Sequence, residues 1–160
     1  MSESIKARVW EWLSDAGSLS QRLRLFTGGC IQHVLRKADW GLITQDEQNL
    51  LSLALNTAWI REIEWHYHNT TWIQARVVIP KSTLQGAGCE LQEITHRPLG
   101  DTLFRDPHLK RSDFIYEAYP FSLQCAHVRR SIFYYYHQPL LVSETFLPAF
   151  FSAVEQKSCS

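Results

Sequence analysis

Two charged residues lie in segments whose neighbours are apolar, and both could do chemistry. Side chains alternate between the two faces of a strand. In residues 58–67 this alternation puts Arg61 on one face with two tryptophans, an isoleucine and a tyrosine. In residues 140–147 it puts Glu144 on one face with a leucine, a valine and a phenylalanine. A buried charge without a partner is costly, so each residue is either paired for structure or retained for function.

A third charged residue, Arg76, lies in residues 72–79, where one strand face is fully apolar and the other is mixed. Arg76 falls on the mixed face, where a solvated arginine is an equally good interpretation. Two arginines and one glutamate on neighbouring strands would suit a dianionic substrate that also carries a hydroxyl group. They would equally suit a structural ion-pair network, and the spacing alone leaves both hypotheses open.

Other chemistries find less support in the sequence. His66 and His68 could point the same way as a metal pair, but we identify no acidic or cysteine partner and predict no metal site. Residues 129–136 combine two arginines with four aromatic residues, as some nucleic-acid surfaces do, yet the RNP pattern is absent and we expect a sheet strand. The common nucleotide-loop, metalloprotease and hydrolase motifs are also absent.

The elements that must position these residues begin with helices. Residues 5–26 show helical spacing that pauses at residues 16–18, which predicts two short helices. Residues 44–47 form a capping-box pattern, so a helix is expected to begin at Gln45. Two later helical segments are expected, one at residues 99–104. The other follows Pro80, is capped by Ser82 or Thr83, and runs toward Ile94.

Strands dominate from residue 58 onward, because aromatic and β-branched residues become frequent there. Hairpin turns are expected at residues 68–70 and 137–138. Helices first and hairpin-connected strands later predict an α+β domain with an antiparallel sheet, one face of which is covered by helices. The expected strands are residues 58–67, 71–79, 113–119, 127–136 and 139–147.

Composition favours one globular domain over residues 1–160, since 45% of the residues are hydrophobic and no linker or repeat interrupts the chain. Sixteen basic residues balance sixteen acidic ones, so we expect neither nucleic acid nor a membrane as a partner. The four cysteines are widely spaced, and residues 1–13 form neither a signal peptide nor a membrane span. We therefore expect a cytoplasmic protein with free thiols.

Several ordered segments resemble the bacterial chorismate pyruvate-lyase family, and together they cover residues 59–149. Before residue 59 the resemblance is limited to residues 12–13 and 18–19. The family is similar in fold to the effector-binding domains of some bacterial repressors. The segments read WIREI at residues 59–63, WIQARVVIPKSTL at 72–84, PLG at 98–100, LF at 103–104, RRS at 129–131 and PLLVSETFLPA at 139–149.

The resemblance implies a cofactor-free enzyme that cuts chorismate into 4-hydroxybenzoate and pyruvate for ubiquinone synthesis. It implies a single antiparallel sheet of about six strands, with helical flaps over an internal site. The family's substrate contacts fall on Leu19, Arg61, Leu99 and Glu144, with leucine at residue 19 where methionine is usual. Arg61 would then hold the ring carboxylate and Glu144 the 4-hydroxyl, while Arg76 would bind the enolpyruvyl carboxylate.

The alternative hypothesis is a non-catalytic domain that binds a small aromatic carboxylate, like those repressor domains. Those repressors carry a DNA-binding domain of about seventy residues upstream, whereas 58 residues precede Trp59 here and lack a basic recognition helix. A further alternative is a lyase-like protein that has lost activity, and the retained Arg61, Arg76 and Glu144 count against it. We expect a monomer whose partners are chorismate and 4-hydroxybenzoate.

Overall fold

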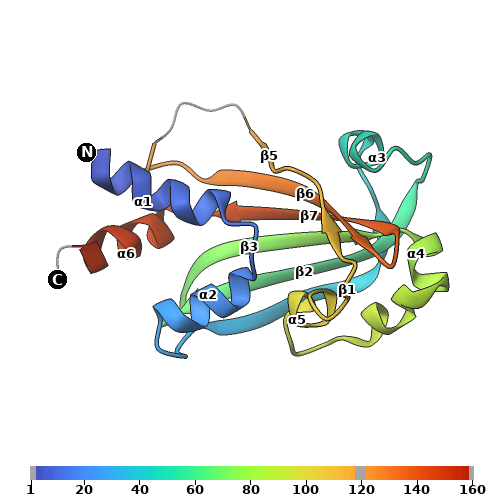
Figure 1. Ribbon diagram of the computed structural model, residues 1–160, viewed down its shortest axis with the longest axis horizontal. Helices are drawn as coiled ribbons and strands as arrows, with labels where there is room; N and C mark the ends of the chain where they lie inside the picture. Colours follow the sequence, from blue (N-terminus) through green and yellow to red (C-terminus); the bar gives the residue numbers. More distant parts are fainter. Residues whose placement is uncertain (1–2, 118–121, 159–160) are drawn as a thin grey trace.

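The computed structural model describes residues 3–117 and 122–158 (Figure 1). At its centre is one seven-stranded antiparallel sheet in the spatial order β1-β2-β3-β7-β6-β4, with β5 also paired to β6. The α+β class and the antiparallel sheet are confirmed. The sheet has one strand more than the six expected, and two of its strands, β4 and β5, are only two residues long. The strands are β1 (Gln32–Leu42), β2 (Thr57–Tyr67), β3 (Thr70–Ile79), β4 (Lys110–Arg111), β5 (Ile115–Tyr116), β6 (His127–Tyr135) and β7 (Gln138–Phe146).

Two long hairpins, β2-β3 and β6-β7, form the middle of the sheet and meet where β3 pairs with β7. Each turns on two residues with positive φ, His68 and Asn69 in the first and Tyr136 and His137 in the second. Two consecutive left-handed residues make the turn whose twist matches that of the flanking strands. The first turn lies where the sequence predicts it, and the second lies one residue earlier.

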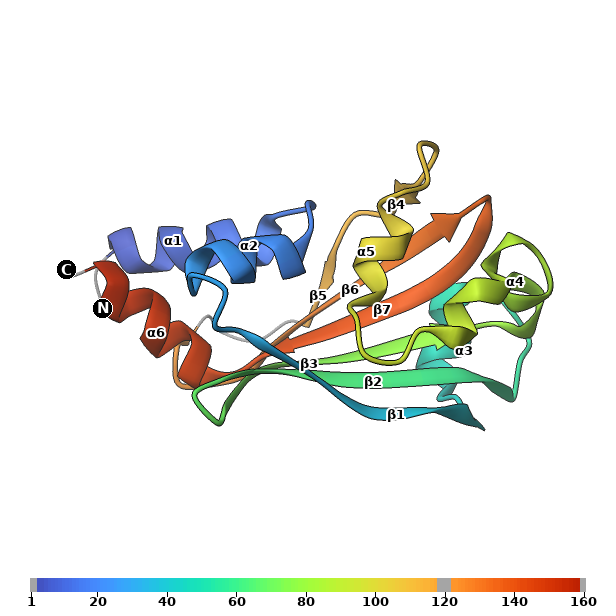
Figure 2. The ribbon, with the colours of Figure 1, turned by 90° about the horizontal axis from the view of Figure 1, so that it is seen from below.

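Helices cover one face of the sheet in two groups (Figure 2). Helices α1, α2 and α6 pack over one end through a core that includes Trp12, Leu23 and Phe150. Helix α4, the 3-10 helix η1 and helix α5 pack over the other end through Leu91 and Leu103. The helices are α1 (Glu3–Ser14), α2 (Leu19–Phe26), α3 (Gln45–Leu51), α4 (Lys81–Gln85), η1 (Ala87–Glu93), α5 (Leu99–Leu103) and α6 (Pro148–Ser158).

Helix α3 is the exception, because it packs on the opposite face, where Leu51 meets Ile60, Val78 and Leu141. The predicted capping box at its start is present: the Thr44 hydroxyl accepts from the backbone N–H of the third helical residue, whose side chain reaches back. Beyond α3 this face carries mainly polar side chains, among them Glu62, Arg76 and Arg130. Within the part of the chain that the structure describes, no helix is long and apolar enough to span a bilayer.

Some sequence predictions are wrong in detail. The helix after Pro80 has Pro80 as its N-cap residue and no side-chain cap, because it begins at Lys81 and the predicted caps Ser82 and Thr83 lie inside it. The Thr83 hydroxyl instead donates to the carbonyl oxygen of Pro139 at 2.7 Å, which ties α4 to β7. The strand expected at residues 113–119 shrinks to β5, and its residues 118–119 lie outside the described residues.

Three elements had no sequence prediction: strands β1 and β4 and helix α6. Strand β1 forms an edge of the sheet and is half exposed, so its side chains show no clean alternation of apolar and polar residues. Its place in the sheet is set by pairing with β2 and not by its own sequence pattern. Strand β1 positions part of the candidate site, so this gap in the prediction matters for function.

Candidate active site

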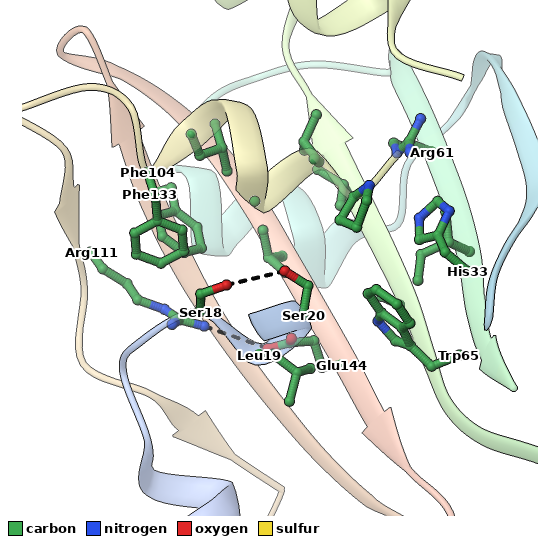
Figure 3. Close-up of a pocket in the computed structure, with 18 of the residues that line it drawn as sticks. Ser18, Leu19, Ser20, His33, Arg61, Trp65, Phe104, Arg111, Phe133 and Glu144 are labelled. Carbon is green, nitrogen blue, oxygen red and sulfur yellow. Dashed lines mark hydrogen bonds and ion pairs between the residues drawn. The ribbon is translucent and has the colours of Figure 1, made fainter. Parts of the chain in front are cut away.

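One pocket lies on the helix-covered face of the sheet, between the two helix groups (Figure 3). Its floor comes from β2, β3, β7 and β6, and its walls come from the segments around α2 and α5. Most of the lining is apolar or aromatic, with a few charged groups, as in typical small-molecule sites. The lining residues are Gly17, Ser18, Leu19, Ser20, His33, Arg61, Ile63, Trp65, Ala75, Val77, Pro98, Leu99, Gly100, Leu103, Phe104, Arg111, Arg129, Phe133, Val142 and Glu144.

Arg61 lies at one end of the pocket and is only 1% exposed. Its Nη1 donates to the carbonyl oxygen of Ile94, and its Nη2 donates to that of Arg97 at 2.7 Å. These bonds use two of the five N–H donors of a guanidinium, so the side chain is fixed while donors remain for a ligand. Burial lowers the pKa of Arg61 to about 10, so the side chain still carries its charge at neutral pH.

Glu144 lies toward the other end and is 7% exposed. Its Oε1 accepts from Arg129 Nε at 2.9 Å and lies 3.5 Å from Arg111 Nη2. Strand register puts Glu144 opposite Ala75 of β3, two strands away from Arg61 and two residues further along. Standard strand spacings then separate the two Cα atoms by about 12 Å. Two inward-pointing side chains at that separation leave room for one six-membered ring between them.

Arg129 and Arg111 are pocket residues that sequence reasoning did not select. Arg129 is 1% exposed, and its Nη1 donates to three backbone carbonyls, two in the last turn of α1 and one just beyond it. A signal was present, because strand alternation puts Arg129 on the same face as Phe133 and Tyr135. Arg111 gave no such signal, since it lies in a two-residue strand within an irregular segment.

Leu19 and Leu99, which the resemblance gives as substrate contacts, both line the pocket. They are the first residues of α2 and α5, which lie next to each other over the sheet (Figure 2). The two helices are joined by Asp101 of α5, whose Oδ1 accepts from the Ser20 hydroxyl at 3.2 Å. Its Oδ2 accepts from Arg24 Nη2 at 3.1 Å. These bonds link the two walls of the pocket.

Arg76 does not join this site, and the expectation that it does is corrected. It points to the opposite face of the sheet, as its place on the mixed face of its strand allowed. There Nη2 donates to Glu47 Oε1 at 3.1 Å and Nη1 donates to Glu62 Oε1 at 2.9 Å. The structural ion-pair interpretation therefore holds for Arg76.

His33 of β1 is a further lining residue that the sequence did not single out. Its ring lies against Trp65 in an edge-to-face arrangement with centroids 5.1 Å apart, next to Arg61 (Figure 3). Its buried Nδ1 has no hydrogen-bond partner among the described residues. Burial, reinforced by the charge of Arg61, lowers the pKa of His33 to about 4. The imidazole is therefore neutral at pH 7.

His66 contacts an acidic residue that sequence reasoning overlooked, since its Nε2 lies 2.6 Å from Glu64 Oε2. Thr71 completes this small surface cluster, in which the Thr71 hydroxyl lies 3.1 Å from the same histidine nitrogen. Across residues 3–117 and 122–158, no three His, Cys, Asp or Glu side chains gather in a way that could hold a metal ion.

The charge of the pocket is strongly biased. Its charged lining residues are three arginines and one glutamate, while His33 is neutral, so two positive charges are left uncompensated among them. Positive charge is present at both ends, with Arg61 at one and with Arg111 and Arg129 beside Glu144 at the other. The arrangement suits an aromatic or cyclic dianion with a hydroxyl group that can reach Glu144.

Solved structures share this fold. The C-terminal domain of a histidine utilization repressor from Pseudomonas syringae pv. tomato superposes with a TM-score of 0.57 at 9% identity, covering 74% of this chain and 92% of that one. A possible transcriptional regulator, YydK, from Bacillus subtilis has a TM-score of 0.54 at 12% identity, covering 76% and 60%. At such identities the likeness defines only a fold class, an α+β domain with an open antiparallel sheet.

Sequence comparison is more specific. The pattern of the family described as "Chorismate lyase" matches residues 2–156. A "Probable chorismate pyruvate-lyase" from Coxiella burnetii is 42% identical, covering 88% of this chain and 83% of that protein. A protein of the same name from Pseudomonas putida is 31% identical, covering 99% and 90%. The chain belongs to the chorismate lyase family.

Proposed function

We propose that this protein is a chorismate pyruvate-lyase that eliminates pyruvate from chorismate and leaves 4-hydroxybenzoate. Family membership supports the proposal, and so do the names of the relatives. The observation that carries it is the placement of Arg61 and Glu144 at opposite ends of one pocket with two uncompensated positive charges. Chorismate is a dianion whose ring bears a carboxylate at C1 and a hydroxyl group at C4, at opposite ends of the ring.

In the proposed complex Arg61 binds the ring carboxylate and Glu144 accepts a hydrogen bond from the 4-hydroxyl group. A guanidinium binds a carboxylate through two parallel N–H bonds, which fixes the plane of the ring as well as its position. Leu19 and Leu99 close the pocket above the ring from the two helical walls. The ligand thereby lies in a largely apolar site in which these few polar contacts are strengthened.

The reaction is an elimination across C3 and C4 of the ring. The C3–O ether bond breaks, and its electron pair leaves with enolpyruvate. The C4–H bond breaks, its electrons form the C3–C4 double bond, and the proton passes to a base. Enolpyruvate then takes up a proton at its methylene carbon and becomes pyruvate. Because the ring becomes aromatic, the step runs downhill and depends mainly on how the substrate is positioned.

Glu144 is the group best placed to receive the C4 proton, because it is proposed to bind the hydroxyl on the same carbon. Arg129 holds the carboxylate in orientation through the 2.9 Å bond to Oε1. A positioned general base contributes roughly a hundredfold or more to a rate.

We further propose that the reaction needs no metal or organic cofactor, that the enzyme is a cytoplasmic monomer, and that its product serves ubiquinone synthesis.

The test is to incubate purified protein with chorismate and follow 4-hydroxybenzoate by its absorbance and pyruvate by a coupled dehydrogenase. The proposal expects both products in equal amounts, at a rate unchanged by a metal chelator. The alternative function is a non-catalytic domain that binds aromatic carboxylates. The fold shared with a repressor domain supports this alternative. Saturable binding of 4-hydroxybenzoate without turnover of chorismate would favour that alternative.

A further inference from the structure

The proposed substrate has two carboxylates, and the pocket must therefore supply two cationic partners. Arg61 serves the ring carboxylate, whereas Arg76, the sequence-based candidate for the second one, is held on the opposite face by Glu47 and Glu62. The enolpyruvyl ether is attached to C3, the ring carbon next to the one that bears the hydroxyl. Its carboxylate must therefore lie on the Glu144 side of the pocket, and the cation that binds it must be near Glu144.

Two arginines meet that condition, and their surroundings differ. Arg129 is fixed by Glu144 at 2.9 Å and by three backbone carbonyls at 2.9–3.1 Å. Its Nε is thus used to hold Glu144, and its Nη1 is used to hold the end of α1 against the sheet. Arg111 contacts the same Glu144 oxygen, but at 3.5 Å, the outer limit of a hydrogen bond. A ligand carboxylate can replace so long a contact at little cost.

The guanidinium of Arg111 is held in place without being saturated. Nε donates to the Ser131 hydroxyl at 2.9 Å, and Nη1 donates to the carbonyl oxygen of Ala16 at 3.1 Å. Its Cζ lies 4.2 Å from the ring centroid of Phe114 and 4.5 Å from that of Phe133, so aromatic faces fix its plane. Burial lowers the pKa of Arg111 to about 10, which leaves the side chain charged at neutral pH.

We propose that Arg111 binds the enolpyruvyl carboxylate through Nη2 and stabilises the enolpyruvate as it leaves. This assignment rests on the proposed lyase function and extends it to the second carboxylate. When the C3–O bond breaks, negative charge grows on the ether oxygen next to that carboxylate, within reach of the same guanidinium. Arg111 would thus act on the substrate and the departing group, while the retained product, 4-hydroxybenzoate, lacks the group it binds.

The difference between substrate and product provides the test. Arg111→Met keeps the chain length and removes the charge, so kcat/KM for chorismate should fall on the order of 100-fold, as for a lost charged hydrogen bond. The Kd for 4-hydroxybenzoate, measured by calorimetry, should change by less than about threefold. Arg130→Met is the matched control, because Arg130 is on the other face of β6 and pairs with Asp46 and Glu117. It should leave both constants unchanged.

A second probe makes the result independent of turnover. The analogue 3-(carboxymethoxy)-4-hydroxybenzoate carries an ether-linked second carboxylate but cannot eliminate. The wild-type protein should bind this analogue at least tenfold more tightly than Arg111→Met does, while both bind 4-hydroxybenzoate alike. Equal losses for both ligands would overturn the assignment, because Arg111 would then act through Glu144 or the fold. A wild-type protein that fails to convert chorismate but shows this selective binding would refute the lyase function while retaining the carboxylate site.

Discussion

Arg129 and Glu144 form an ion pair inside the protein, with Nε and Oε1 2.9 Å apart and the arginine 1% exposed. The same guanidinium donates to the carbonyl oxygens of Trp12, Leu13 and Asp15. One side chain therefore links the proposed catalytic carboxylate to the segment that carries α2 over the pocket.

Removing the arginine from this pair should destabilise the fold strongly. Arg129→Met leaves a buried carboxylate and several carbonyls with fewer partners, which costs about 3–5 kcal/mol. Equilibrium unfolding in guanidinium chloride measures the change. Arg130→Met, which removes a partly exposed arginine from the next position, should cost less than about 1 kcal/mol. A loss of similar size in both variants would mean that Arg129 is not a structural link.

The bridge from α5 to α2 should slow the release of product. Asp101→Asn abolishes the ion pair with Arg24 and weakens the bond from Ser20. Because the pair is partly exposed, its loss is worth about 0.5–1 kcal/mol, or a two- to fivefold faster release of 4-hydroxybenzoate. Stopped-flow displacement measures the rate. Asp46→Asn, which removes an exposed ion pair on the opposite face, is the control and should leave the release rate unchanged.

His33 should make the folded protein sensitive to mild acid. Its pKa is about 4 in the fold, through burial and the nearby Arg61, against 6.5 for an ordinary histidine. Between these values the unfolded chain binds a proton that the folded chain refuses, so stability falls as the pH drops from about 6.5 to about 4. Unfolding of wild type and His33→Gln at pH 7 and pH 5 should show a smaller acid loss in the variant. Identical losses would contradict the burial of a neutral imidazole.

Glu144→Gln separates catalysis from binding. Glutamine keeps the shape and still accepts one hydrogen bond from the 4-hydroxyl group, so the affinity for 4-hydroxybenzoate should fall only modestly. If the carboxylate also receives the C4 proton, kcat should fall by roughly a hundredfold or more. Steady-state kinetics and calorimetry on the same preparation give both values. Near-normal turnover in the variant would reduce Glu144 to an orienting group.

Whether a site residue could be predicted from the sequence depended on the pattern of the residues around it. Arg61 and Glu144 could be found because burial alternates at residues 61–65 and 142–146 of the long central strands, so a charge on the apolar face is conspicuous. The same test marked Arg76 as ambiguous, and the structure places it on the opposite face. Arg129 carries the same signal, but it is followed by the partly exposed Arg130 and an aromatic run, a combination that some nucleic-acid surfaces share.

Arg111 and His33 could not have been predicted in this way. Arg111 lies in a two-residue strand, where no period can be counted, and its position comes from pairing with β6 and from the two phenylalanine rings. His33 belongs to an edge strand with a bulge, whose register is set by β2. In both cases pairing with a distant strand places the residue in the site, and the local sequence pattern does not indicate that position.

The central claim is that one ligand lies between Arg61 and Glu144 with its carboxylate on the arginine. The most direct measurement is the calorimetric Kd of 4-hydroxybenzoate for wild type and Arg61→Lys. Lysine keeps the charge but loses one of two parallel bonds, at a cost of about 1.5–3 kcal/mol, so the Kd should rise roughly 10- to 150-fold. An unchanged Kd in a variant that folds normally would contradict the account, because the carboxylate would then be bound elsewhere.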